Sequence, residues 1–351
     1  MSEKKKTLLT LILSTALVFT GCGTGTDGGA GSDLSEDNTH TEGSEELKTV
    51  KIGATSATAQ LTECAQIAQN LGYIDEELKA VGYRAEYVGF AGAGPAVNEA
   101  FAAGEIDYAF YADFPAITAK SNHVDLKVVG VANSQMNYGL LVTNDSGIEK
   151  AADIEGKRII VTPGTILYKY FAELCQENNV DINKVETVNA LTDAQTILAS
   201  GDADGLISGL GNTKMYELMG VGKVVVDSTT NLKYSSGFVL AGRTEFVLGN
   251  TDVNKALLRA LKRAAEYAKQ NPDKAYDLMV TEAMTKEMLK ATYGYDESFD
   301  YFMPELSEEY LERAKSVYHF ARDNSLLGSD VNLDELFDST YVDEVMAEQN
   351  E

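Results

Sequence analysis

From Val50 onward, short runs rich in β-branched and aromatic residues alternate with longer segments in which apolar residues recur every three or four positions. The short runs are typical of buried strands, and the longer segments of helices that pack on one face. The first half of this pattern predicts strands at 50–54, 84–88, 108–111, 126–131 and 140–143, and helices at 61–71, 95–103 and 115–122. Because strands and helices alternate, we expect an α/β fold with mainly parallel sheets flanked by helices.

The same order of elements then begins again. Further strands are expected at 158–161, 185–189 and 206–208, and further helices at 167–177 and 194–200. In each half an apolar helix stops at a glycine, Gly104 or Gly201, and a strand follows. Glycine suits the left-handed position that ends many helices. The repeat therefore predicts two lobes of similar build.

Two matching dipeptides, Tyr138-Gly139 and Ser236-Gly237, mark the ends of the second half. Each leads into an apolar strand, as expected where a chain crosses between two lobes. The predicted organisation is 48–142 for the first part of lobe I, 143–236 for lobe II and 237–351 for the return to lobe I. The return is helical, with helices expected at 252–270, from Pro272 and at 307–324, and we expect them to pack on lobe I.

The N-terminal segment has the pattern of a signal peptide. Three lysines precede an apolar run at 8–19, which has the length of a signal-peptide core and is too short to span a bilayer. The run ends in Thr20-Gly21-Cys22, which resembles the cleavage and lipidation signal of bacterial lipoproteins. We predict a signal peptide at 1–21, a lipid on Cys22 and a flexible, Gly- and acid-rich tether at 22–47. The alternative is plain cleavage near Gly21 with Cys22 unmodified.

Charge and cysteine content exclude two classes of protein. The 351 residues carry 29 Lys and Arg against 54 Asp and Glu, a formal net charge of −25. Such a chain repels phosphate backbones, so we predict no binding to nucleic acid. Only three cysteines are present, which excludes a disulfide framework.

No residue set for catalysis is evident. The three histidines lie far from one another and from any cysteine, so no metal site is expected. Cys64 and Cys175 fall on apolar helix faces, where a buried free thiol is the ordinary outcome. The loop Gly89 to Gly94 follows a strand, but its glycines are spaced in the reverse of a dinucleotide-binding loop. We therefore predict no catalytic residues, no metal and no cofactor.

Exposed helix starts are the remaining polar features. Segments 55–58, 92–95 and 163–165 each follow a strand and open a helix, leaving backbone N–H groups without internal partners. In parallel α/β sheets such starts converge on one crevice, where they favour an anion or a polar acceptor. The alternative is that the threonines and serines here only cap helices, and both roles are compatible.

Several segments, taken in order, resemble a known family. They are Gly94-Pro95-Ala96, Ala100 to Asp107, Ala151 to Ile159, Thr162 to Thr165 and Ala199 to Asp204. Over about residues 48–346 the chain is similar to the aliphatic-sulfonate, taurine and nitrate solute-binding proteins. The resemblance implies a two-lobed type II periplasmic-binding fold with a ligand cleft between the lobes. It also implies a monomer on the outer face of the cell membrane that delivers a small molecule to the permease and ATPase of an ABC importer.

The same resemblance places ligand-binding residues in the loops between strands and helices. They are Thr55, Ser56, Phe90, Ala91, Gly92, Ala93, Tyr111, Asp113, Thr165, Ile166 and Asn212. Tyr138 and Tyr234, near strand ends, extend an expected aromatic cleft. No arginine is placed in these loops, so the ligand is either a sulfonate- or nitrate-like anion or a small heteroaromatic molecule.

Two other functions stay open. One is an enzyme on the same fold, which would resemble thiamine-pyrimidine synthase; that branch relies on a cysteine-rich cluster and a pocket histidine, and this sequence shows neither. The other is a sensory surface lipoprotein built from the same lobes.

Overall fold

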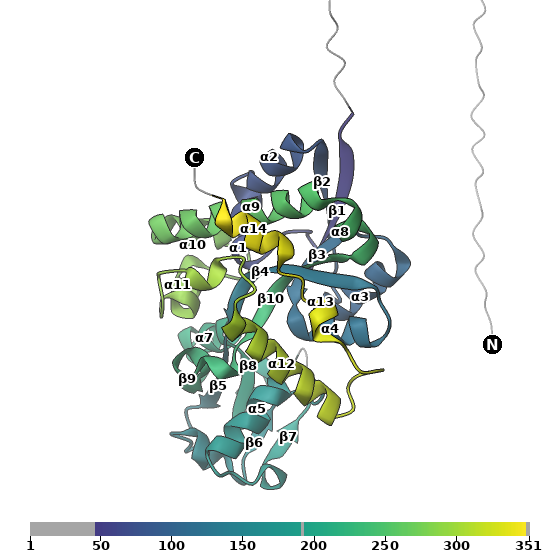
Figure 1. Cartoon of the computed structure of the whole chain (residues 1–351). Helices are drawn as coiled ribbons and strands as arrows, with labels where there is room; N and C mark the ends of the chain where they lie inside the picture. Colours follow the sequence, from purple (N-terminus) through teal and green to yellow (C-terminus); the bar gives the residue numbers. More distant parts are fainter. Residues whose placement is uncertain (1–45, 191–192, 349–351) are drawn as a thin grey trace, which may run out of the picture. The chain divides into compact units, whose positions relative to one another are not determined.

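Two five-stranded sheets organise the computed structural model, which describes residues 46–190 and 193–348 (Figure 1). The first has the order β2 (Tyr83–Gly89), β1 (Lys48–Ala54), β3 (Tyr108–Ala112), β10 (Ser236–Arg243), β4 (Leu126–Met136). The second has the order β7 (Glu186–Val188), β6 (Arg158–Ile160), β8 (Gly205–Gly209), β5 (Tyr138–Thr143), β9 (Gly222–Asp227). The predicted signal peptide, Cys22 and the tether up to residue 45 lie outside the described residues.

The two sheets share one topology. In the first, β1 pairs in parallel with β2 and β3, while β10 runs antiparallel to β3 and β4. In the second, β6 pairs in parallel with β7 and β8, while β5 runs antiparallel to β8 and β9. Each antiparallel strand enters its sheet from the other lobe, which reverses its direction. The predicted α/β fold with two similar lobes is confirmed.

Helices cover both sheets. Those around the first sheet before the C-terminal segment are α1 (Glu63–Asn70), α2 (Tyr73–Ala80), α3 (Ala93–Ala103), α4 (Asp113–Ser121), α8 (Thr244–Gly249) and α9 (Thr251–Gln270). Those of the second are α5 (Ile166–Glu177), α6 (Ala194–Ser200) and α7 (Leu210–Leu218). Gly104 and Gly201 end α3 and α6 with φ of 69° and 75°, as the sequence predicted. Short 3-10 turns include η4 (Leu232–Tyr234) and η5 (Asp300–Phe302).

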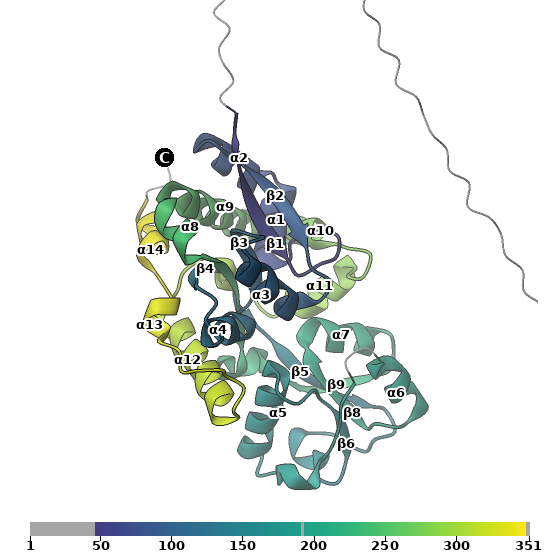
Figure 2. The ribbon, with the colours of Figure 1, turned by 90° about the vertical axis from the view of Figure 1, so that its right-hand side faces the viewer.

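The C-terminal helices return to the first lobe and also contact the second. They are α10 (Pro272–Met279), α11 (Lys286–Tyr293), α12 (Glu308–Asp323), α13 (Leu333–Leu336) and α14 (Thr340–Ala347). As predicted, α10 packs on α1 and α9, α14 on α9 and α13 on β4. In addition, α11 packs on α7, and α12 packs on α4, β10 and α5 (Figures 1 and 2). Two C-terminal helices therefore bridge the lobes at separate places.

The first strand crossing lies earlier than the sequence suggested. β4 ends at Met136 in the first sheet, and β5 begins at Tyr138 in the second. The expected boundary after residue 142 assigned β5 to lobe I, but β5 pairs with β8 and β9, so Asn137 is the crossing residue. The return crossing leads into β10 at Ser236. The Tyr138 hydroxyl and the Ser236 hydroxyl are hydrogen-bonded, which ties the two crossings together.

No helix among the described residues combines the length and the apolar character needed to cross a bilayer.

Candidate functional site

A cavity of about 310 Å³ lies where the first crossing meets both lobes. Its walls come from the start of α1, the residues Asn133 to Asn137, the start of α7 and the helices α10 and α11. The size is at the lower end of the range for small-molecule sites. Because residues of both lobes and of the crossing line it, a molecule bound here would contact both lobes at once.

The start of α1 is placed in this cavity by Leu61. The sequence predicted a helix from residue 61, but Leu61 lies outside the helix, where it is fully buried and its N–H donates to Gln69 Oε1 at 2.9 Å. Helix α1 therefore begins two residues later, after Thr62, and Glu63 adopts a φ of 60°. A non-glycine residue in this left-handed region is costly and often found at functional sites.

Glu63 is held by neutral partners. Its Oε2 accepts a hydrogen bond from the Tyr293 hydroxyl at 2.6 Å and another from Asn133 Nδ2 at 3.0 Å. Burial raises the pKa of Glu63, against the effect of these two hydrogen bonds. No described Lys, Arg or His pairs with Glu63, and Oε1 has no hydrogen-bond partner among the described residues.

Gln66 lies one helical turn after Glu63, so the two side chains share a face of α1. It is only 3% exposed and lines the same cavity. Its Nε2 is buried with no hydrogen-bond partner in the described residues. Such a group costs about 1–3 kcal/mol when left unpaired. Two lining residues therefore carry polar atoms without a described partner: an acceptor at Glu63 Oε1 and a buried donor at Gln66 Nε2.

Asn137 joins the cavity wall to the crossing. Its Nδ2 donates to the Tyr295 hydroxyl at 2.8 Å, and its Oδ1 accepts from the Ser228 and Ser235 hydroxyls, each at 2.7 Å. Its main-chain carbonyl accepts from the N–H of Leu210, the first residue of α7, at 2.8 Å. One residue thus connects the C-terminal segment after α11, both crossings and lobe II.

The rest of the cavity is apolar or carries neutral polar groups. Met136, Met279, Met284, Leu210 and Leu289 form its apolar surface. Of the described residues that line it, none is Lys, Arg or His, and Glu63 is the only one with a carboxyl group. The arrangement suits an organic body with hydrogen-bonding groups and offers no cation to a free anion.

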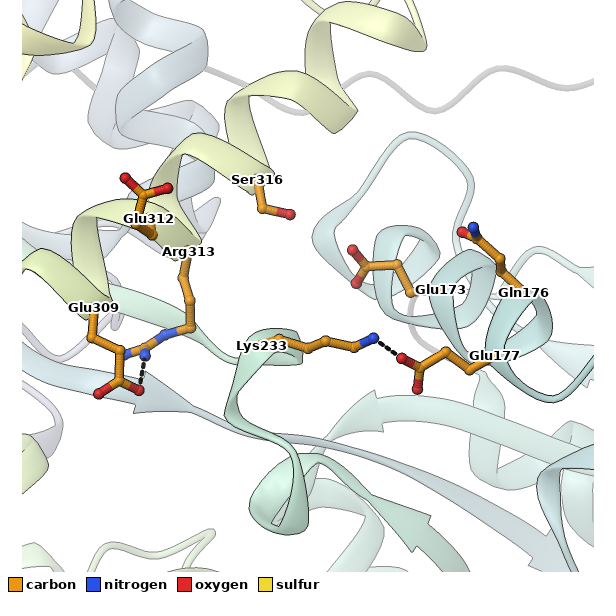
Figure 3. A pocket seen from close by; sticks show the side chains of 8 residues that line it. All are labelled: Glu173, Gln176, Glu177, Lys233, Glu309, Glu312, Arg313 and Ser316. Carbon is orange, nitrogen blue, oxygen red and sulfur yellow. Dashed lines mark hydrogen bonds and ion pairs between the residues drawn. The ribbon is translucent and has the colours of Figure 1, made fainter.

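A second cavity between the lobes has the opposite chemistry. It measures about 590 Å³ and is lined by four glutamates, Lys233, Arg313 and two neutral polar residues from α5, η4 and α12 (Figure 3). Lys233 pairs with Glu177, and Arg313 pairs with Glu309 at 2.8 Å. We call it the ionic groove, and the cavity around Glu63 the amide cavity. They share no lining residue.

Among the residues predicted to bind ligand, Asn212 lines the amide cavity. Thr55 and Ser56 follow β1 and are partly exposed, and the Ser56 hydroxyl bonds that of Thr58 at 2.9 Å. Thr165 caps α5: its hydroxyl donates to the Thr162 carbonyl at 2.7 Å and accepts from the Tyr168 N–H at 3.4 Å. Ile166 packs against the cores of both lobes.

The glycine-rich loop serves close packing. A Cβ at Gly89 would lie 2.5 Å from the Ser56 carbonyl oxygen, so only glycine lets the loop after β2 approach the loop after β1. Beyond it, Phe90 is half-buried against the first core, while Ala91, Gly92 and Ala93 are exposed.

Three predicted aromatic residues lie in the cores instead of on a cleft. Tyr111 is fully buried with its ring 6.0 Å from that of Phe101. Tyr138 and Tyr234 pack against Tyr170 in the core of the second lobe, with ring centres 5.8 and 5.4 Å from it. These positions correct the expectation of an aromatic cleft: strand ends at the lobe junction are buried by the crossing strands and the C-terminal helices.

Asp113 is also buried at this junction, at the first turn of α4. Its Oδ2 accepts from the Gly237 N–H at 2.7 Å and from the Tyr310 hydroxyl at 3.4 Å. Burial raises its pKa to about 6, although these hydrogen bonds and the nearby Lys169 lower it. Asp113 therefore connects lobe I to the return crossing.

Sequence reasoning missed Glu63, Gln66, Asn133, Asn137 and Tyr293. One signal was available: Glu63 and Gln66 stand three residues apart, at helical spacing, in the mostly apolar stretch from Leu61 to Ala68. A polar pair on a buried helix face is unusual, because unpaired buried polar groups are costly. The other three residues are brought to the site from distant segments by the fold.

Residues 67–275, more than half of the chain, match the protein family described as NMT1/THI5 like. The chain belongs to this family. A Bacillus subtilis (strain 168) protein named as an aliphatic sulfonates-binding protein is 22% identical over 347 residues, which are 97% of each chain.

Solved structures of the same fold include binding proteins and an enzyme. The periplasmic sulfonate-binding protein SsuA from Methylobacillus flagellatus KT superimposes with a TM-score of 0.77 at 23% identity, over 86% of this chain and 94% of its own. The desulfurization enzyme DSZB superimposes with a TM-score of 0.69 at 17% identity, over 85% of this chain and 99% of its own. At these identities the likeness shows the fold.

The cysteines of this NMT1/THI5-like chain are poorly placed for nucleophilic chemistry. Cys64 and Cys175 are buried free thiols, as predicted. The Cys64 thiol donates to the Leu261 carbonyl at 3.5 Å, and burial raises its pKa. A thiol acts as a nucleophile only after it loses its proton, which this environment opposes.

Proposed function

We propose that this chain is the extracytoplasmic solute-binding component of an ABC importer. The observation that carries the proposal is the amide cavity, which lies between two lobes of one topology and uses the crossing residue Asn137 as part of its wall. A solute held there makes contacts from both lobes, so it stabilises the closed arrangement over an open one. The closed form is what the permease and ATPase of an importer would receive.

The experiment measures closure and transport. The chain from residue 46 onward is purified from its native host, and any solute carried through purification is released and identified by mass spectrometry. Adding that solute to the solute-free protein should reduce the radius of gyration in small-angle X-ray scattering. Deleting the gene should abolish uptake of the same solute. An unchanged radius together with normal uptake in the deletion strain would refute the importer role.

Anchoring at Cys22 is the second part of the proposal. A lipid on Cys22, preceded by a signal peptide at 1–21 and followed by a tether at 22–47, would hold the monomer at the outer face of the membrane. In Cys22→Ser the protein should move from the membrane fraction to the soluble extracytoplasmic fraction. Equal membrane retention of both proteins would exclude the lipid anchor.

We propose that the chain binds its solute without converting it. The support is the chemistry of the amide cavity: its one carboxylate has only neutral neighbours, and the thiols are buried away from it. The desulfurization enzyme with the same fold makes this testable. Incubation of the purified protein with the identified solute should return that solute unchanged by mass spectrometry.

A further inference from the structure

The amide cavity contains polar groups that the protein itself leaves unsatisfied. Gln66 is only 3% exposed, and its amide nitrogen has no hydrogen-bond partner among the described residues. Glu63 keeps a free Oε1 and a left-handed backbone, one turn away. The unpaired Gln66 amide and the left-handed backbone of Glu63 each lower the stability of the protein. Two such costs on one helix face point to a molecule that supplies the missing partners.

The missing partners have a definite chemistry. Glu63 Oε1 needs a hydrogen-bond donor, and Gln66 Nε2 needs an acceptor. Glu63, in the first turn of α1, already places a carboxylate at the positive end of the helix dipole. A free anion would therefore face Glu63 without any described Lys, Arg or His on the cavity wall to offset the repulsion.

We infer that Glu63 and Gln66 recognise a solute that carries an amide or amidine group, neutral or cationic, attached to an apolar body. The inference rests on the proposed function and specifies its substrate class. The N–H group donates to Glu63, the neighbouring acceptor receives Gln66 Nε2, and the apolar body lies against the methionines. Met279 and Met284 suit this part because their flexible side chains adapt to different shapes.

The test uses four probes with the same ring and different head groups: benzamidine, benzamide, methyl benzoate and benzenesulfonate. Binding to residues 46–351 is measured by isothermal titration calorimetry. Benzamidine or benzamide should bind at least about tenfold more tightly than the ester and the sulfonate, since the latter two leave Glu63 without a donor. Failure of both N–H-bearing probes to bind, or tighter binding of benzenesulfonate, would overturn the inference.

Three variants locate the binding. Glu63→Gln should weaken benzamidine binding by about tenfold or more, and Gln66→Leu should weaken benzamide binding by about threefold to tenfold. Gln176→Leu is the control, because Gln176 is an exposed residue of the ionic groove and does not line the amide cavity. Its affinity should stay within about twofold. If Glu63→Gln and Gln66→Leu bind both N–H-bearing probes as the wild type does, the inference is wrong.

Melting temperatures separate binding from folding. Gln66→Leu removes an unpaired buried group, so it should melt at the wild-type temperature or above, whereas Gln69→Leu should melt lower because Leu61 loses its acceptor. Loss of affinity with intact melting in Gln66→Leu therefore supports the inference. The importer role is judged independently: a co-purified sulfonate that closes the lobes would uphold that role and refute this substrate class.

Discussion

The amide cavity and the ionic groove both lie between the same two lobes, but their polar side chains are paired in opposite ways. The amide cavity pairs its one carboxylate with a hydroxyl and an amide, and it leaves polar atoms unused. The ionic groove pairs its cations with carboxylates on each wall (Figure 3). Charges that already have partners gain little from a small molecule, while unpaired buried groups gain much. The comparison therefore favours the amide cavity for ligand recognition, because each ion pair of the ionic groove joins residues of one lobe or of one helix.

The largest effect should come from Asn137, the residue that the amide cavity shares with the crossing. Asn137→Ala leaves the buried Ser228 and Ser235 hydroxyls without their acceptor. At about 1–3 kcal/mol for each unpaired group, the free energy of unfolding should fall by about 2–5 kcal/mol. Urea denaturation measures it. Asn144→Ala is the matched control, since Asn144 makes a single exposed contact at 3.4 Å with the Gly220 carbonyl; equal losses in both variants would contradict the assignment.

The stability of the folded chain should depend on pH through Asp113, which is buried at the lobe junction. Burial raises its pKa to about 6 in the folded chain, above the value of about 3.9 for an unperturbed aspartate. The folded state then binds a proton more tightly than the unfolded state, so this group favours folding as pH falls from about 6 to about 4 and disfavours it above about 6. The groups that face it are Tyr310, Tyr138 and Lys169.

The measurement compares Asp113→Asn with the wild type by urea denaturation between pH 4 and pH 8. The variant cannot ionise here, so its stability relative to the wild type should rise with pH, by at most about 3 kcal/mol. Asp145→Asn, an exposed position in the second lobe, controls for the change of net charge. A difference between variant and wild type that stays flat across this range would show that Asp113 does not titrate in it.

Arg313 tests how strongly its side of the ionic groove, helix α12, is attached to the first lobe. It is nearly buried, and its guanidinium donates to the Ser134 carbonyl of β4 at 2.8 Å and pairs with the exposed Glu309. Arg313→Met should reduce the free energy of unfolding by about 1.5–3 kcal/mol, mostly from the lost charged hydrogen bond to Ser134. Because exposed pairs are screened by salt, this loss should persist at 0.5 M NaCl. Arg322→Met, on the same helix with an exposed partner, should change stability little.

The strand pattern could be predicted because it depends on local chemistry. The site could not be predicted, because it depends on how distant segments pack together. Strand 50–54 and the glycine stop at Gly104 follow from periodicity and backbone freedom, and both are present. Helix α7 was missed because Gly211 and Asn212 have low helix propensity; tertiary contacts with β5 and β9 hold it. Asn133 and Tyr293 meet Glu63 across 70 and 230 residues, a separation that no local pattern encodes.

The smallest effect should come from Thr165, which opens the helix that forms the lobe II wall of the ionic groove. Its hydroxyl is already engaged with the Thr162 carbonyl and the Tyr168 N–H, so the capping role is structurally accounted for. Thr165→Ala should lower the free energy of unfolding by about 1 kcal/mol through the lost cap. If capping is its whole role, affinity for the identified solute stays within about twofold in calorimetric titration. A loss beyond about tenfold would instead support the predicted ligand-binding role of Thr165, and it would extend the binding site beyond the amide cavity toward the loop after β6. Thr162→Val provides the comparison, because it keeps the main-chain acceptor used by Thr165 while removing the neighbouring hydroxyl from the same loop.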